Sequence, residues 1–370
     1  MKIKKVWEFN AKEQLLGLEL GFLLEQNIKL LITYSKSGKL WIFNLEGLRL
    51  YDDNITQNSP IWCCKFFDID DDGNYELLLG GLDGLLRVFK LNPDFSLKFY
   101  WAHQFGSSIS GFFIDDINND GKVEIVAYSL DKSLRIINPV DGSLIWGQVF
   151  EEGIGEAILW RNSNNPKDIE IIACGNDGTV RIFNANNGEL IWFKKFTDKV
   201  RCISYIRSIH DKYIICGGDD KLIHIIDKRK REEIKTIAMN NVVWKSISFP
   251  PDRNNFIIIS SYSFDFLIDS IPIEDIEFQS KVVCLNEYLN IIWEKKNINS
   301  ELLKYIQTPK QNFIGIGTTK GRFLIINEKS GEILAQINNK FSINDFEFIS
   351  ESNQLILCHD NGYIYSYNIS

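Results

Sequence analysis

Several kinds of segment that would assign this chain to a class are missing from its sequence. The 370 residues contain no run of about 18 apolar residues, so no helix is expected to cross a membrane. The first ten residues, 1–10, alternate apolar and polar side chains and lack the apolar centre of a signal peptide. We therefore expect a cytoplasmic protein without a membrane span.

Positive charge is also scarce. The net charge of −8 and the pI near 5.3 argue against general binding to nucleic acid or to anionic membranes, because both require a basic surface. The seven cysteines are odd in number and lie in apolar runs without the spacing of a disulfide framework, so buried thiols are expected.

Motifs for metal binding, phosphate binding or catalysis are equally scarce. The four histidines show no metal-ligand spacing, and the paired glycines are followed by no helix that would complete a phosphate-binding loop. No nucleophile and base stand in a recognisable arrangement. These observations count against an enzyme.

What the sequence does contain is an internal repeat. Eight turn residues each open an apolar segment, at intervals of 46, 48, 46, 43, 59, 41 and 41 residues: Gly38, Gly84, Lys132, Gly178, Lys221, Ser280, Gly321 and Gly362. Six residues after each turn, seven of eight positions hold Asn or Asp, which end strands: Asn44, Lys90, Asn138, Asn184, Asp227, Asn286, Asn327 and Asn368. A period of about 40–50 residues with several short strands is typical of a β-propeller.

The repeat predicts an all-β fold: a single eight-bladed β-propeller domain, residues 1–370, built of four-stranded antiparallel blades, with seven blades as the alternative. The last unit, 341–370, has material for only three strands. Its outer strand is expected to come from residues 4–10, so that the N-terminal strand pairs into the C-terminal blade and closes the ring. Blade six carries an insertion at about 261–279.

Two blades carry an acidic turn between their first and second strands. Residues 68–76 read D-I-D-D-D-G-N-Y-E in blade two, and residues 116–124 read D-I-N-N-D-G-K-V-E in blade three. Oxygens at positions one, three, five, seven and nine of such a turn can converge on a hard cation, Ca²⁺ ahead of Mg²⁺. The alternative is that the acids cap backbone amides. The candidate metal ligands are Asp68, Asp70, Asp72, Asn74, Glu76, Asp116, Asn118, Asp120, Lys122 and Glu124.

A second motif is a turn glycine followed four residues later by tryptophan, as in residues 141–146 and 187–192, where the aromatic ring can wedge between blades. This style resembles the PQQ-like (quinoprotein-dehydrogenase-like) propeller repeats, and the ring is similar to WD-repeat propellers. The acidic turns look like the calcium loops of FG-GAP and VCBS-type repeats. The resemblance implies structural Ca²⁺ in two loops, although Glu replaces the family's usual Asp at the ninth position of both.

A column of cations occupies one third-strand position in successive blades: Arg87, Arg135 and Arg181, continued by His224. The column could form an anion-binding ridge. The favoured interpretation is packing between blades, by stacking on aromatic rings or by pairing with a column of glutamates. Those glutamates are Glu76, Glu124 and Glu170.

The insertion in blade six mixes apolar residues with five acids. An apolar loop of this length either folds back on its own blade or contacts a partner. The candidate partner-binding residues are Phe264, Phe266, Leu267, Ile271, Ile273 and Phe278.

From these features we expect a non-catalytic protein–protein interaction scaffold or adaptor, a subunit of a cytoplasmic multiprotein assembly whose protein partner is unidentified. The alternative is a small-ligand-binding or quinone-dependent enzyme-like propeller that uses the central funnel. That alternative requires polar side chains converging from the first strands, and those strands are rich in apolar residues instead.

Overall fold

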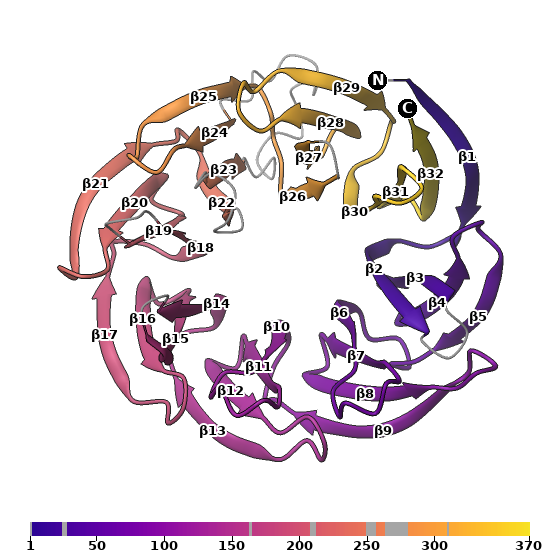
Figure 1. Ribbon diagram of the computed structural model, residues 1–370, viewed down its shortest axis with the longest axis horizontal. Helices are drawn as coiled ribbons and strands as arrows, with labels where there is room; N and C mark the ends of the chain where they lie inside the picture. Colours follow the sequence, from indigo (N-terminus) through magenta and orange to yellow (C-terminus); the bar gives the residue numbers. More distant parts are fainter. Residues whose placement is uncertain are drawn as a thin grey trace. The chain divides into compact units, whose positions relative to one another are not determined.

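A computed structural model describes residues 2–23, 28–162, 165–207, 212–248, 257–262, 280–308 and 311–370. The described residues form 32 β-strands, which pair into eight four-stranded antiparallel sheets (Figure 1). The protein is an all-β, eight-bladed β-propeller, as the repeat predicts. Among the described residues there is no helix long and apolar enough to span a membrane.

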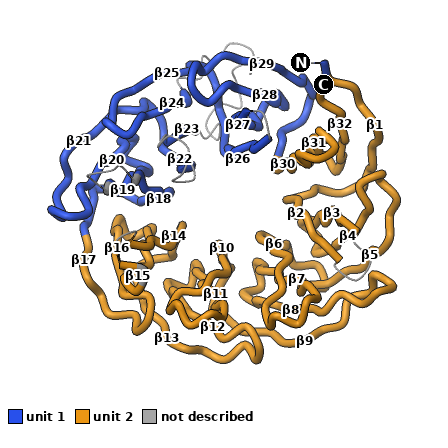
Figure 2. Tube along the Cα trace, in the orientation of Figure 1, with its two compact units in different colours: residues 1–2, 194–343 blue, residues 3–193, 344–370 orange. Residues whose placement is uncertain are grey.

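The chain divides into two compact units, residues 1–2 with 194–343 and residues 3–193 with 344–370 (Figure 2). The first unit contains blades five to seven. Their strands are β18 (Val200–Arg207), β19 (Lys212–Gly218), β20 (Leu222–Asp227) and β21 (Glu232–Ala238); β22 (Val242–Ser248), β23 (Ile257–Tyr262), β24 (Lys281–Leu285) and β25 (Ile291–Lys296); and β26 (Leu302–Gln307), β27 (Asn312–Gly317), β28 (Arg322–Asn327) and β29 (Ile333–Asn338).

The second unit contains blades one to four, as far as Phe193 within β17, and nearly all of blade eight. Blades one and two comprise β2 (Leu15–Leu23), β3 (Ile28–Ser35), β4 (Lys39–Asn44) and β5 (Arg49–Asn54), then β6 (Ile61–Phe67), β7 (Glu76–Gly81), β8 (Leu85–Leu91) and β9 (Leu97–Gln104). Blades three and four comprise β10 (Ile109–Asp115), β11 (Glu124–Ser129), β12 (Ser133–Ile137) and β13 (Leu144–Val149), then β14 (Ile154–Asn162), β15 (Asn165–Gly175), β16 (Thr179–Asn184) and β17 (Leu190–Lys195).

Blade eight joins the two ends of the chain. Its strands are β30 (Ile343–Ile349), β31 (Gln354–His359), β32 (Tyr363–Ile369) and, as the outer strand, β1 (Ile3–Asn10). Strand β1 runs antiparallel to β32, with Ile3 opposite Ile369 and Asn10 opposite Tyr363. The predicted pairing of the N-terminal strand with the C-terminal blade is confirmed.

The core of each unit lies between neighbouring blades. The second strands are the most deeply buried, and β7 and β31 are buried along their whole length, because sheets pack against both of their faces. Apolar clusters join the inner strands of adjacent blades within each unit. All seven cysteines are free thiols; six are buried in these strands and Cys63 is half-buried, largely as predicted.

An outer-strand tryptophan packs on the turn glycine of the following blade in four places: Trp7 on Gly47, Trp101 on Gly142, Trp146 on Gly188 and Trp293 on Gly331. Each indole Nε1 also donates to a backbone carbonyl of that turn, at 2.8–3.0 Å. A Cβ on any of these glycines would stand 2.5–2.7 Å from the ring. The wedge predicted for the tryptophan of residues 141–146 is confirmed at Trp146, and the glycine it covers belongs to the next repeat.

Replacing Gly142 by alanine tests this contact. The residue has φ +71°, and the Trp101 ring blocks a Cβ, so Gly142→Ala is expected to lower the free energy of unfolding by about 2–5 kcal/mol. The matched control is Gly121→Ala, because Gly121 has φ +89° with nothing within 4 Å of the added Cβ. In urea unfolding, the free energy of unfolding of the control should decrease by only about 1–2 kcal/mol. Equal losses would show that the tryptophan contact is irrelevant.

Candidate functional site

The acidic loop of blade two, residues 68–76, connects β6 to β7. Asp68 caps its backbone: Oδ1 accepts the N–H of Asp72 at 3.2 Å and Oδ2 accepts the N–H of Gly73 at 2.9 Å. Asp72 Oδ1 in turn accepts the N–H of Asn74 at 2.8 Å. The backbone-capping interpretation therefore describes part of this loop.

Lys90, near the end of β8, reaches into the same loop. Its Nζ lies 2.9 Å from Asp70 Oδ2, 3.4 Å from Asp72 Oδ2 and 3.7 Å from Glu76 Oε1. The hydrogen bond to Asp70 and the surrounding carboxylates raise the pKa of Lys90, which stays charged. The chain itself thus places a cation among the predicted metal ligands.

Two buried carboxylate oxygens of this loop accept no hydrogen bond: Asp70 Oδ1 and Glu76 Oε1. These residues and Asp68 each offer one oxygen within 4.8 Å of the others. Buried carboxylate oxygens without donors are unfavourable, and oxygens grouped in this way are suitable ligands for a hard cation. Of the predicted blade-two ligands, the structure brings these three closest together.

Glu76 is the most deeply buried acid of the loop, with no exposed surface. Burial raises its pKa to about 7; the N–H of Ile69, which donates to Oε2 at 3.1 Å, opposes the shift, and the charge of Asp70 adds to it. The site therefore contains a carboxyl group that titrates near neutrality.

The loop of blade three, residues 116–124, has the same backbone plan. Asp116 accepts the N–H groups of Asp120 at 3.1 Å and Gly121 at 2.9 Å, as Asp68 does for its counterparts. The N–H of Lys122 donates to Asp120 Oδ1 at 2.8 Å. The first carboxylate of each loop therefore shapes the turn.

The centre of the blade-three loop holds an amide instead of an ammonium group. Asn118 Nδ2 donates to Asp120 Oδ2 at 3.0 Å and to Glu124 Oε1 at 2.9 Å. Its Oδ1 accepts the N–H of Asp120 at 2.8 Å, which sets the orientation of the amide. Burial also raises the pKa of Glu124. In both loops a nitrogen of the chain lies between the predicted ligands.

The roles of Lys90 and Asn118 were not evident from sequence. Lys90 does stand out as the one exception in the column of strand-ending Asn and Asp. Its approach to the acids follows from the pairing of β7 with β8, which puts Glu76 opposite Lys90. That pairing was available from the predicted hairpin, whereas the direction of the lysine side chain was not.

The arginine column pairs with aspartates of its own turns, so the predicted pairing with Glu76, Glu124 and Glu170 is wrong. The ion pairs are Arg87 to Asp83 at 2.5 Å, Arg135 to Asp131 at 3.0 Å and Arg181 to Asp177 at 2.8 Å. Glu76 and Glu124 begin β7 and β11, and Glu170 lies within β15, whereas the arginines face the turns where these strands end. The predicted aromatic stacking holds for two members, Arg135 and Arg181, which lie over Phe105 at 4.3 Å and Phe150 at 4.0 Å.

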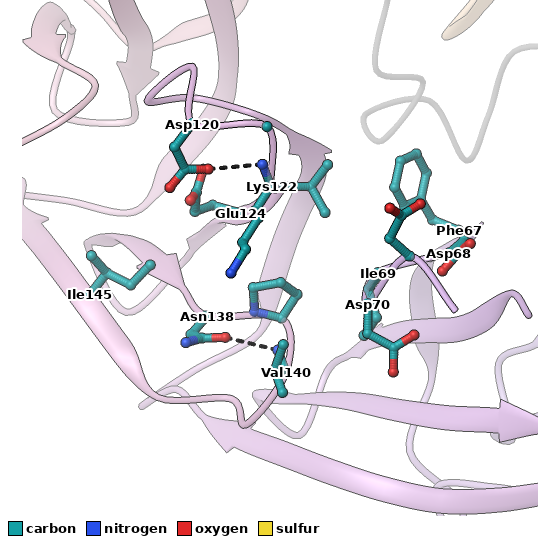
Figure 3. Close-up of a pocket in the computed structure, with 14 residues that line it drawn as sticks. Phe67, Asp68, Ile69, Asp70, Asp120, Lys122, Glu124, Asn138, Val140 and Ile145 are labelled. Atoms are coloured by element: carbon teal, nitrogen blue, oxygen red, sulfur yellow. Dashed lines mark hydrogen bonds between the residues drawn. The ribbon is translucent and has the colours of Figure 1, made fainter. Parts of the chain in front are cut away.

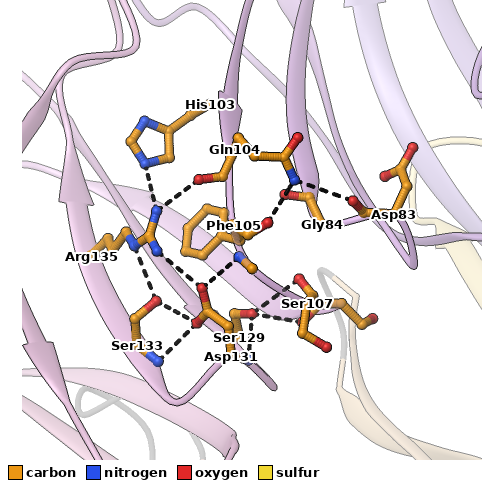
Figure 4. A network of polar contacts seen from close by, with 12 residues as sticks. Asp83, Gly84, His103, Gln104, Phe105, Ser107, Ser129, Asp131, Ser133 and Arg135 are labelled. Atoms are coloured by element: carbon orange, nitrogen blue, oxygen red, sulfur yellow. Dashed lines mark hydrogen bonds and ion pairs between the residues drawn. The ribbon is translucent and has the colours of Figure 1, made fainter.

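Around Arg135 these contacts join blades two and three (Figure 4). The guanidinium donates to the carbonyl of Gln104 at 2.8 Å and contacts His103 Nε2 at 3.1 Å, both at the end of β9. Asp131 also accepts the N–H of Gly106 at 2.8 Å. Since these donors are engaged within the protein, the cation column has a packing role.

A groove of about 850 Å³ lies between the two acidic loops (Figure 3). These loops precede β7 and β11, whereas the turns that hold Arg87 and Arg135 follow those strands. Five carboxylates and one lysine belong to its lining, so its formal charge is −4. Three apolar residues of the lining are exposed: Phe67 by 36%, Val140 by 51% and Ile145 by 50%. The groove combines negative charge with accessible apolar surface.

The six predicted partner-binding residues of blade six lie outside the described residues: Phe264, Phe266, Leu267, Ile271, Ile273 and Phe278. Strands β23 and β24 flank this insertion. Its contact role stays a prediction.

The raised pKa of Glu76 has a consequence for stability. Because its folded pKa of about 7 exceeds the unfolded value near 4.5, the folded state binds the proton more tightly between these values. Stability should therefore fall as pH rises from about 4.5 to 7, by about 1–3 kcal/mol from this group. The test measures the free energy of unfolding in urea at several pH values, without metal. Glu76→Gln should remove this part of the decrease with pH, while Glu189→Gln, at an exposed site, should keep it. The same dependence of the unfolding free energy on pH in the natural protein and in both variants would refute the raised pKa of Glu76.

Comparison with known proteins also indicates a β-propeller. A family model described as the lambda-carrageenase β-propeller domain matches residues 140–255, less than half of the chain. No curated protein matches the sequence. Sqt1 of Saccharomyces cerevisiae is similar in structure, with a TM-score of 0.75, 11% identity and complete coverage of both chains.

Two further structures are similar over almost the whole chain. BamB from Moraxella catarrhalis has a TM-score of 0.62 and 13% identity, with complete coverage of both chains. The computationally designed Ika8 protein has a TM-score of 0.74 and 11% identity, covering 99% of this chain and 100% of its own. At these identities the likeness shows the fold alone, and it agrees with the eight-bladed β-propeller of this chain.

Proposed function

We propose that this chain is a non-catalytic interaction scaffold, a subunit of a cytoplasmic multiprotein assembly. The observation that carries the proposal is the groove between the acidic loops, which exposes apolar side chains beside a formal charge of −4. Exposed apolar surface bordered by charge is typical of protein-binding sites, where burial supplies affinity and charge supplies selectivity. The Arg135 network and the blade-to-blade packing provide a preformed frame for such a surface.

The reactive side chains of the described residues support a scaffold over a catalyst. Burial raises the pKa of Cys63 and Cys284 to about 12, which keeps both thiols protonated and weakly nucleophilic. His224 lies 2.7 Å from both Asp220 and Glu233, in contacts that fix its ring. His103 contacts Arg135 and the carbonyl of Gly142.

Isolation of the chain from its native source, followed by reconstitution with each recovered protein, tests the scaffold. We expect a stoichiometric complex in size-exclusion chromatography with light scattering. Deletion of residues 263–278 tests the insertion separately: retention of every partner would contradict its predicted contact role. A cofactor absorbing visible light, or turnover of a small substrate without any complex, would favour the enzyme-like alternative, to which the match with a carrageenase propeller domain also points.

A specific observation supports a second property, calcium binding in blade two. Asp70 Oδ1 and Glu76 Oε1 are buried without hydrogen-bond donors, and Asp68 lies beside them. A bound cation would use these oxygens, and Lys90 would have to withdraw from the loop. In blade three Asn118 stands at the position of Asp70, and its amide already donates to Glu124 Oε1, the counterpart of Glu76 Oε1. Calcium bound here would stabilise the turn and supply no chemistry.

Calorimetric titration of Ca²⁺ into metal-free protein tests this property. Lys90→Asn introduces the residue most common at the equivalent position and removes the competing charge, so we expect calcium affinity to increase about tenfold or more. Asp120→Asn, in blade three, should leave the affinity unchanged. The absence of heat at millimolar Ca²⁺ for both the natural protein and Lys90→Asn would refute the site.

A further inference from the structure

We infer that the groove between blades two and three binds a basic, apolar segment of a partner protein. This inference rests on the proposed scaffold function and names the chemistry of the partner. The groove is formed by the loops that precede β7 and β11, by the turn after β12 and by β13 (Figure 3). Its volume of about 850 Å³ falls within the roughly 300–1,000 Å³ range of ligand sites.

The charge of the groove selects a cationic occupant. Asp70 and Asp71 lie on the blade-two wall, and Asp120 and Glu124 lie on the blade-three wall. Lys122 is the one basic residue of the lining. A segment with lysine or arginine side chains can approach carboxylates on both walls, and an acidic segment would be repelled.

Several of these acids are already bonded, so the groove retains its shape while it attracts a ligand. Asp120 accepts hydrogen bonds from Asn118 and Lys122, and Asp70 Oδ2 accepts one from Lys90. Asp71, the next residue along the loop, is exposed. An incoming ammonium or guanidinium group therefore has an acceptor on the blade-two wall without breaking an existing contact.

The apolar part of the lining requires more than charge from the occupant. Val140 and Ile145 each expose about half of their surface along one side of the groove, and Phe67 adds an aromatic ring. Free polyamines or metal ions would leave these side chains in water. Aliphatic residues between the basic ones would bury them, which favours a peptide segment.

The two walls are held at a set separation before any ligand binds. Trp101, on β9 of blade two, donates its indole N–H to the carbonyl of Pro139, a lining residue on blade three, at 2.8 Å. The same ring covers Gly142, in the turn that leads into β13. A preformed groove loses less conformational entropy on binding than a mobile one.

The test uses immobilised peptides of equal length and leucine content whose net charge runs from strongly positive to strongly negative, in calcium-free buffer. We expect the full-length protein to retain the positive peptides and release them as salt increases. The retained peptides are then measured in solution by fluorescence polarisation. Asp71→Asn with Asp120→Asn should weaken binding by about fivefold or more, and Val140→Ser should weaken it further.

The matched control is Glu189→Gln with Glu332→Gln, which changes the net charge equally at exposed positions outside the groove. Equal binding by the groove variant and the control would overturn the inference, as would a lack of preference for positive peptides. Both variants are also tested in the reconstituted complex. A complex that survives the groove substitutions refutes the groove alone, whereas failure of every protein to form a complex refutes the scaffold.

Discussion

The apolar faces of the inner strands can be buried only between neighbouring blades, and the rest of the structure follows from that constraint. Each four-stranded sheet is too small to hold a core of its own, so clusters span adjacent blades within each compact unit. The tryptophan of one outer strand then covers the turn glycine of the next blade and bonds to its backbone. Apolar burial and a directed hydrogen bond therefore act at the same junction.

Polar contacts secure both ends of the strands around these junctions. At one end, Arg135 connects blade three to the last residue of β9, and Asp131 connects it to Gly106 just beyond that strand. At the other end, the acidic loops enclose a nitrogen of the chain, Lys90 in blade two and Asn118 in blade three. The two loops look alike in sequence and differ in charge balance, because an ammonium group carries a charge that an amide lacks.

The groove is a product of this arrangement. Loops of two blades approach each other because the sheets that carry them are packed together, and acids that are distant in sequence then line one surface. Val140 and Ile145 complete that surface from a turn and an outer strand. Their exposure has no signature in the repeat pattern, since the apolar residues Leu144 and Ile145 at the start of β13 are both exposed although they read as part of an apolar run.

The sequence by itself predicted the strand order, eight blades in preference to seven, and the pairing of residues 4–10 with the C-terminal blade, because turn chemistry and apolar periodicity are local properties that recur eight times. It also identified the acidic loops. Only the tertiary structure decided that the arginines pair with Asp83, Asp131 and Asp177, that Lys90 enters the blade-two loop, and that the two loops share a groove. Those outcomes depend on side-chain direction and on distances across blades, which spacing along the chain does not specify.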